Sequence, residues 1–168
     1  MSVRHSTLIT PASSDADMDA VRALFGEYIA SLGVDLAFQG VEAELAGLPG
    51  PYAPPRGALL IARTGEGEPV GCVGLRPLRE QGVCEIKRLY VRPQARGQDL
   101  GRRLALAVIA AARAAGFARM RLDTLAPMRS AQALYASLGF QPTPAYYDNP
   151  LPGTQYMALD LDGTLQSS

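Results

Sequence analysis

The chain has 168 residues, and its 16 lysines and arginines balance 16 aspartates and glutamates, giving zero formal net charge. This length can bury a single core, and 48% hydrophobic residues is ordinary for a globular protein. No apolar run approaches the ~18 residues of a membrane span, and residues 1–6 lack the apolar core of a signal peptide. We therefore expect one cytoplasmic domain over residues 1–168, with flexible tails at 1–5 and 163–168.

Cysteine and histidine are scarce, which argues against several kinds of catalytic and metal site. Cys72 and Cys84 lie in strand-like segments, and we expect buried reduced thiols. The single histidine, His5, falls in the predicted tail, so the chain offers no Ser-His-Asp or Cys-His pair. The same scarcity argues against a zinc site, and we expect no metal. Lys87 is the only lysine, which we attribute to compositional bias.

The spacing of apolar residues predicts alternating strands and helices along the chain. In chain order these are a strand at 6–10, helices at 15–32 and 38–48, strands at 58–63, 70–75 and 84–91, a helix at 98–115, a strand at 119–125, a helix at 128–138, and strands at 145–147 and 155–161. This order mixes antiparallel hairpins with one strand–helix–strand crossover. We therefore expect a single mixed sheet covered by helices.

The segment 84–91 carries an interruption in its alternation. Alternate residues of a regular strand share a face, as Cys84 and Ile86 would. The next apolar pair is Leu89 and Val91, which is one residue out of phase. One extra residue near 87–88 returns all four to one face, which is what a β-bulge does. Bulges leave backbone groups unpaired, often beside a functional site, whereas an edge strand with irregular alternation is the plainer alternative.

A glycine-containing loop follows this strand and leads into the long helix. Gly97 and Gly101 allow close approach of the backbone, and the helix from Gln98 directs free N–H groups and its positive dipole end at the loop. Residues 84–103 contain six basic and two acidic side chains, so positive charge is concentrated here. Two glycines before a helix are a weak signal alone. Together with the bulged strand and the arginines, they predict an anion-binding site.

Two separated motifs resemble signatures of the GNAT superfamily of acetyl-CoA-dependent N-acetyltransferases. Residues 96–101, Arg-Gly-Gln-Asp-Leu-Gly, resemble the signature Arg/Gln-x-x-Gly/Ala-x-Gly/Ala, and the segment before them is similar to the fourth strand of the family. Residues 131–140, Ala-Gln-Ala-Leu-Tyr-Ala-Ser-Leu-Gly-Phe, resemble the second signature, Ala-x-x-Leu-Tyr-x-x-x-Gly-Phe. The resemblance implies an α/β (α+β) GNAT-like fold. Its twisted, mostly antiparallel sheet would have about seven strands, a β-bulge in strand 4 and about four flanking helices.

The resemblance also implies a function. Acetyl-CoA would be the cosubstrate, and its acetyl group would pass by direct attack to a primary amine of a small molecule. The backbone at Leu89 and Val91 would bind the pantetheine arm like an added strand, and the N–H groups of 97–101 would bind the diphosphate. The implied cofactor-binding residues are Leu89, Tyr90, Val91, Arg96, Gly97, Gln98, Asp99, Leu100, Gly101 and Arg102.

Two side chains are candidates for proton transfer. Glu85 lies just before the predicted bulge, on the face opposite Cys84, and matches the glutamate that some relatives use as a base, directly or through a water. A surface glutamate paired with Arg88 or another nearby arginine is the plainer interpretation of Glu85. Tyr135, in the second motif, is the candidate acid that protonates the sulfur of coenzyme A. A core aromatic is its plainer interpretation.

Two positions depart from the family pattern. Asp99 stands where the signature has glycine or alanine, and its carboxylate would repel a diphosphate unless it turns outward as a helix cap. Met128 stands where many relatives have an asparagine that contacts the cofactor, so we expect that contact to be missing.

Other functions stay open. A protein acetyltransferase acting on a lysine or an N-terminus, and a non-catalytic acyl-CoA-binding or sensing module, fit the same motifs. An unrelated nucleotide binder ranks low because no Gly-x-Gly-x-x-Gly start or Gly-Lys-Ser/Thr ending is present. The zero net charge argues against nucleic acid, and no membrane partner is expected.

By resemblance, the first two helices and the loop 148–153 would line the entrance for the acceptor. The acids there could favour a cationic amine, but scattered surface acids are the simpler explanation. They are Asp35, Glu42, Glu44 and Asp148. The identity of the acceptor and the oligomeric state are not predicted, and a homodimer stays open.

Overall fold

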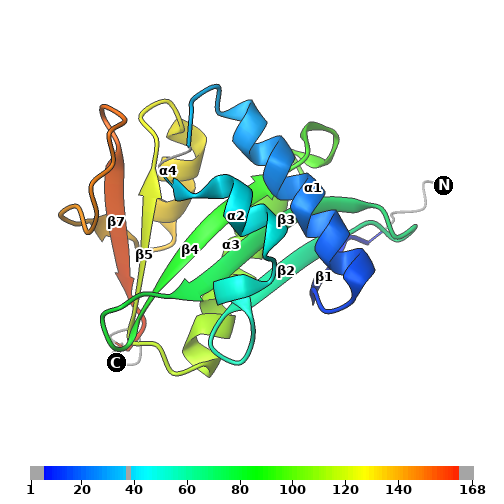
Figure 1. The fold of residues 1–168 in the computed structure, drawn as a ribbon, viewed down its shortest axis with the longest axis horizontal. Coiled ribbons are helices and arrows are strands. Elements are labelled where there is room, and N and C mark those ends of the chain that lie inside the picture. The colour runs from blue at the N-terminus through cyan, green and yellow to red at the C-terminus, as the bar shows by residue number, and fades with distance from the viewer. Residues whose placement is uncertain (1–5, 37–38, 163–168) are drawn as a thin grey trace.

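The computed structural model describes residues 6–36 and 39–162, so the predicted tails and the start of the helix predicted at 38–48 lie outside the described residues. The described chain forms one seven-stranded sheet in the order β1-β2-β3-β4-β5-β7-β6 (Figure 1). Every neighbouring pair is antiparallel except β4 and β5, which are parallel. The predicted mixed and mostly antiparallel sheet is confirmed.

The bounds of most elements lie within a few residues of those predicted from the sequence. The strands are β1 (Leu8–Pro11), β2 (Ala58–Arg63), β3 (Pro69–Pro77), β4 (Val83–Val91), β5 (Arg119–Thr124), β6 (Gln141–Pro142) and β7 (Gln155–Asp160). The helices are α1 (Asp15–Ser31), α2 (Val41–Ala46), α3 (Leu100–Ala114) and α4 (Arg129–Ser137), with short 3₁₀ helices η2 (Gly50–Tyr52) and η3 (Pro93–Ala95). Ser14 caps α1, accepting a hydrogen bond from the backbone N–H of Asp17.

The strand predicted at 145–147 is wrong. The partner of β7 is the short strand β6, where Gln141 lies opposite Ala158. Tyr146 and Tyr147 instead lie in the connection between β6 and β7, and their hydroxyls donate to acidic side chains on β4 and β5. Alternation of apolar residues could not reveal this, because these tyrosines use their polar ends in tertiary contacts.

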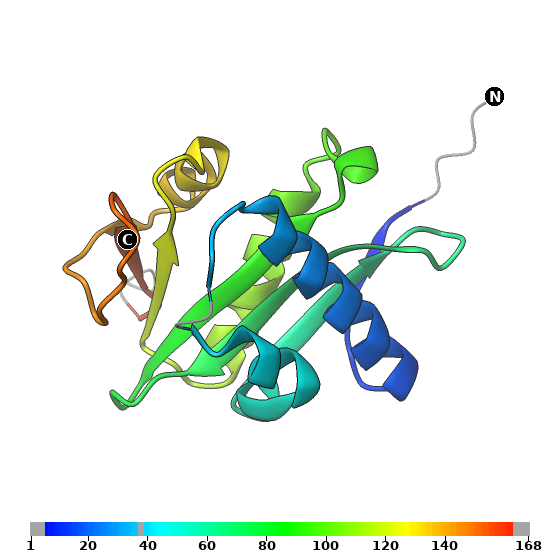
Figure 2. The same ribbon diagram turned by 45° about the horizontal axis from the view of Figure 1, so that its top comes forward.

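The two faces of the sheet bury separate apolar clusters. On one face α1 contributes Val21, Leu24 and Phe25, which pack with residues of β2 and β3. On the other face Leu104 and Val108 of α3 pack with residues of β3, β4 and β5. Figures 1 and 2 show α1 and α2 on one side of the sheet and α3 on the other. No helix among the described residues is long and apolar enough to span a bilayer.

The bulge predicted in β4 is confirmed. Gly74 of β3 lies opposite Lys87 and Cys72 lies opposite Tyr90, so one residue of β3 faces two residues of β4. Arg88 has a left-handed backbone, with φ of 60°, as an interruption of the strand requires. After the bulge, Leu89 packs against the same cluster as the residues of β4 before it.

The strands β4 and β5 part immediately before the bulge. Their parallel pairing extends only from Val83 and Arg119 to Glu85 and Arg121. Beyond these residues the two strands diverge (Figures 1 and 2). The edge of β4 that faces β5 therefore has no paired strand from residue 86 to 91.

Candidate active site

Two cavities meet where β4 and β5 part. We call the first the inter-strand cleft; it runs from the bulge past β4, between the end of α1 and the start of α4. We call the second the polar cavity; it has a volume of about 480 Å³ and is lined by residues of α2, β3, β4, β5 and the connection from β6 to β7. Gln39, Lys87 and Arg88 line both. A molecule in the cleft and another in the cavity would meet at these three residues.

The predicted segment 89–91 lines the inter-strand cleft. The N–H of Arg92 donates to Val70 of β3 at 2.8 Å. Because successive N–H groups of a strand point in opposite directions, the N–H of Val91 faces away from β3, into the cleft. The side chain of Tyr90 lies on the face of α1, where its hydroxyl donates to Glu27 at 3.4 Å. Tyr90 is therefore available to the cleft mainly through its backbone.

The loop before α3 presents a run of free backbone donors. None of the backbone N–H groups from Gly97 to Arg102 donates to another described residue, and the first bond of the helix is donated by Arg103. Gly97 has φ of 87°, and a Cβ placed on it would meet open space. The loop is thus an open concave row of donors at the positive end of a helix of 15 residues.

The charged side chains of this loop contact one another or neighbouring groups. Asp99 is 70% exposed, and its carboxylate lies 3.6 Å from the guanidinium of Arg102. Its side chain makes no cap hydrogen bond. Arg102 also donates to the hydroxyl of Ser137 at 2.9 Å, and Arg96 donates to the carbonyl oxygen of Val91 at 3.1 Å. The acidic residue that departs from the family signature is thus outward and paired.

The bulge residue is tied to α2. The guanidinium of Arg88 donates to both carboxylate oxygens of Glu44, at 2.9 and 3.2 Å. The hydroxyl of Tyr52 donates to the same carboxylate at 2.8 Å. Burial raises the pKa of Glu44, but the hydrogen bonds and charge of Arg88 outweigh it and lower the pKa below its usual value. Of the four acids predicted near the entrance, Glu44 alone lines the polar cavity, and its charge is already matched.

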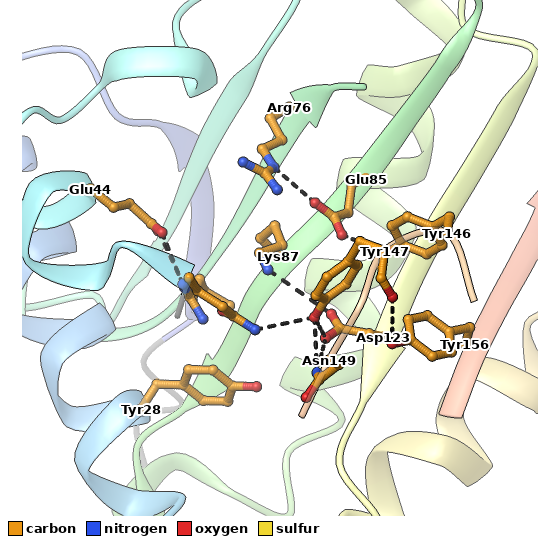
Figure 3. A network of polar contacts seen from close by, with 12 residues as sticks. Tyr28, Glu44, Arg76, Glu85, Lys87, Asp123, Tyr146, Tyr147, Asn149 and Tyr156 are labelled. Atoms are coloured by element: carbon orange, nitrogen blue, oxygen red, sulfur yellow. Dashed lines mark hydrogen bonds and ion pairs between the residues drawn. The ribbon is translucent and has the colours of Figure 1, made fainter. Parts of the chain in front are cut away.

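Glu85 is buried at the wall of the polar cavity, with its side chain 1% exposed. One carboxylate oxygen accepts from Arg76 at 2.8 Å, and the other accepts from the hydroxyl of Tyr146 at 2.5 Å (Figure 3). The plainer interpretation is correct in the ion pair, whose partner is Arg76 on β3, but wrong in placing Glu85 at the surface. The predicted position opposite Cys84 is also correct.

A second group of polar residues lies beside Glu85 (Figure 3). The ammonium of Lys87 lies 4.0 Å from the carboxylate of Asp123, and both side chains are less than 10% exposed. The other oxygen of Asp123 accepts hydrogen bonds from Tyr147 and from the amide of Asn149. Burial lowers the pKa of Lys87, against the opposite effect of Glu85 and Asp123.

Tyr135 is buried behind the bulge, on α4. Its ring packs edge-on against Phe140 with centroids 5.5 Å apart, and the residue also lines the inter-strand cleft. Burial strongly raises the pKa of its hydroxyl, so the group stays protonated at neutral pH. Met128, at the start of the same helix, accepts from the hydroxyl of Tyr28 at a distance of 4.0 Å from its sulfur.

Sequence reasoning missed several residues of the polar cavity. Lys87 was attributed to composition, although it lies two residues from Glu85 and must share its face before the bulge. The same alternation places Arg121 of this cavity on one face of β5 with Asp123, which lines the inter-strand cleft. Tyr146 and Tyr147 gave no such signal, because they lie in an irregular segment. Both cysteines are buried and free, as predicted.

Comparisons with known proteins agree with this geometry. Residues 28–140 match the family model described as the acetyltransferase (GNAT) family. An uncharacterized N-acetyltransferase of Schizosaccharomyces pombe is 43% identical over 145 residues, covering 86% of this chain and 89% of that protein. The uncharacterized N-acetyltransferase YjgM of Escherichia coli is 34% identical over 135 residues, covering 79% of each chain.

Solved structures show the same fold. A structure assigned as an acyl-CoA N-acyltransferase from Klebsiella pneumoniae is 33% identical, with a TM-score of 0.70 over 92% of this chain and 97% of that one. An acetyltransferase of the GNAT family from Staphylococcus aureus is 20% identical, with a TM-score of 0.74 over 93% and 99%. The family match, these relatives and the bulged strand before an open helix start lead to one conclusion: the chain belongs to the acetyltransferase (GNAT) family and is an acetyl-CoA-dependent acetyltransferase.

Proposed function

We propose that the protein transfers the acetyl group of acetyl-CoA to a primary amine of a small molecule by direct attack. The junction of the two cavities carries this proposal. The inter-strand cleft has the open backbone that a pantetheine arm would pair with, and the polar cavity opens onto it at Gln39, Lys87 and Arg88. Donor and acceptor held in this way would have their reacting atoms side by side.

The residues of the cleft fit the cosubstrate, which supplies an acetyl thioester when bound. Residues 97–102 would hold the diphosphate through their free N–H groups, with added charge from Arg96 and Arg102. The exposed N–H of Val91 and that of Leu89 would bind the pantetheine amides as a neighbouring strand does. Because the carboxylate of Asp99 lies near the guanidinium of Arg102 and makes no cap hydrogen bond, it does not occupy the donors of the loop.

The amine must lose a proton to become a nucleophile. We assign this step to Glu85, acting directly or through a water, because it is buried in the wall of the polar cavity. Asp123 is a second carboxylate at the same junction, and it lines the cleft beside the bulge. Both carboxylates are held by hydrogen bonds, so replacing each in turn distinguishes them.

Tyr135 is assigned as the acid that protonates the departing sulfur. Its hydroxyl has a raised pKa and is therefore present as a donor throughout the neutral range. It lines the inter-strand cleft, whereas Glu85, the assigned base, lines the polar cavity on the side that faces α2. The separation of acid and base on the two sides of the reacting centre is what direct transfer requires.

A small amine fits the polar cavity better than a protein chain would. The cavity is bounded by α2 on one side and by Tyr146 and Tyr147 on the other, and its volume is in the usual range for small ligands. A non-catalytic acyl-CoA sensor would bind the cosubstrate in the cleft but would need no acid and base at the junction.

The test is an assay of free thiol released from acetyl-CoA across a panel of primary amines, with the N-acetyl product identified by mass spectrometry. We expect thiol release that depends on the amine, and an equal amount of N-acetylated amine. Acetylation of peptides but of none of the small amines would replace this proposal by a protein acetyltransferase. Acetyl-CoA binding with no turnover on any acceptor would indicate a sensor.

A further inference from the structure

The polar cavity has more positive than negative side chains in its lining. Its basic residues are Arg76, Arg79, Lys87, Arg88 and Arg121, and its acidic residues are Glu44, Glu80 and Glu85. Each acid is matched by one arginine, in ion pairs of 2.8 to 3.0 Å. Within this lining, Lys87 and Arg79 are left without a carboxylate of the cavity. The cavity is therefore suited to a ligand that brings a negative charge.

Of these two residues, Lys87 gives the stronger indication of an anionic ligand, because its charge is buried. Its side chain is 7% exposed, and its one ion pair among the described residues is with Asp123 at 4.0 Å, which is beyond hydrogen-bond distance. A buried ammonium is costly unless it is paired and hydrogen-bonded. Tyr147 and Asn149 donate to the other oxygen of Asp123, so this carboxylate is held by them and not by Lys87. An anionic group on a ligand would supply the hydrogen bonds that Lys87 lacks.

Two further buried atoms of the lining have no hydrogen-bond partner among the described residues. They are the Nε of Arg121, a donor, and the Oε1 of Gln39, an acceptor. Buried polar atoms in native proteins are nearly always satisfied, so unsatisfied atoms on residues that line a cavity point to a ligand. Gln39 also lines the inter-strand cleft, so it lies at the junction, where an attacking amine in the cavity would meet the thioester in the cleft. The cavity thus offers cationic donors for an acid and, at the junction, an acceptor for an amine.

We propose that the acceptor is an amine that carries a carboxylate close to its amino group, as an amino acid does; this rests on the acetyl transfer proposed above. The carboxylate binds Lys87 and the Nε of Arg121, and the amine donates to the Oε1 of Gln39. As the bond from nitrogen to the acetyl carbon forms, the bond from that carbon to sulfur breaks. The amine proton passes to the carboxylate base, and the sulfur takes a proton.

The experiment compares a set of amino acids with the corresponding primary amides, using acetyl-CoA and a thiol readout. For the wild type we expect kcat/KM about 10- to 100-fold higher with the acids, because a hydrogen bond to a charged group is at stake. Lys87→Met should remove this difference by raising KM for the acids, and leave the amides within about threefold. Lys87→Arg should restore part of it. Arg113→Gln, which removes a positive charge on α3 across the sheet, should behave as the wild type.

Equal rates for acids and amides in the wild type would overturn the inference. So would an equal loss for both in Lys87→Met, which would mean that Lys87 only supports the structure. If no amine is acetylated, the proposed function fails, and calorimetric titration of an amino acid and its amide in the presence of coenzyme A decides the carboxylate site separately. Binding of the acid alone, abolished in Lys87→Met, would support the site; equal binding or none would reject it.

Discussion

The guanidinium of Arg88 donates two hydrogen bonds, of 2.9 and 3.2 Å, to the carboxylate of Glu44. Arg88 is the bulge residue, with φ of 60°, and its side chain is 4% exposed. A non-glycine residue in this conformation is strained and persists only where its surroundings hold it. The ion pair from α2 therefore stabilises the bend of β4 that opens the inter-strand cleft.

Replacing Glu44 by Ala should destabilise the protein by about 3 to 5 kcal/mol, because Arg88 is left as a buried charge without a partner. Chemical denaturation measures this change. Glu42→Ala, an exposed substitution on the same helix, is the matched control and should cost less than about 0.5 kcal/mol. A loss for Glu44→Ala no larger than for the control would show that the ion pair does not hold the bulge.

Glu85→Gln and Asp123→Asn separate the two candidate bases. We expect Glu85→Gln to lower kcat by about 10²- to 10⁴-fold, the usual contribution of a general base, with little change in affinity for acetyl-CoA. Asp123→Asn keeps acceptors for Tyr147 and Asn149 and should lower kcat much less. Steady-state kinetics with the best amine of the panel decide the matter. The reverse order of effects would transfer the role of base to Asp123.

Tyr135→Phe removes only the hydroxyl and keeps the ring contact with Phe140. We predict a fall in kcat of about 10²-fold or more, with the KM for acetyl-CoA and the melting temperature little changed, because only the proton donor is lost. Parallel calorimetric and kinetic measurements on the purified variant test this. An undiminished kcat would mean that Tyr135 is a core aromatic only.

Gly97→Val should weaken the binding of coenzyme A by at least about tenfold, because a β-branched residue resists φ of 87° and would move the N–H groups beside it. Gly116, with φ of 89° just after α3, offers a matched control. Gly116→Val carries a similar strain far from the cleft. Isothermal titration of coenzyme A should show weaker binding for Gly97→Val alone; equal affinities in the two variants would exclude the loop as the diphosphate site.

Stability should fall in acid partly through Asp17. Hydrogen bonds from the backbone of Ser13 and from Arg63 lower the pKa of this carboxyl from 3.8 to about 2. Because the folded pKa is the lower one, the stabilisation is complete above 3.8 and is lost as pH falls through about 2.

Asp17→Asn should therefore cost about 1 kcal/mol at neutral pH, a typical value for a capping residue, and nothing at the acid end of that window. Urea titrations at several pH values measure the difference between variant and wild type. A difference that does not shrink toward low pH would contradict the assignment.

The fold was largely predictable because its signals are local. The run 58–63 is apolar up to Arg63 and became β2 with the same bounds, and Ser14, a residue type that favours N-caps, caps α1. The phase shift after Ile86 located the bulge to within a residue. These signals depend only on residues that are close in sequence, so one sequence is enough to recognise them.

The site was predictable only in part, because its polar cavity is assembled from distant segments. Tyr146 reaches Glu85 across 61 positions, and Glu44 reaches Arg88 across 44. No pattern within one segment encodes such pairs. Lys87 is different. Alternation along the strand puts it on the same face as Glu85, so the sequence could have predicted it as a residue of the site.

Amine-dependent release of thiol from acetyl-CoA by the wild-type protein tests the central claim most directly. We expect thiol and N-acetylated amine to form in equal amounts, and neither to form when the amine is omitted. Tight binding of acetyl-CoA with no amine-dependent thiol from any acceptor of the panel would contradict it.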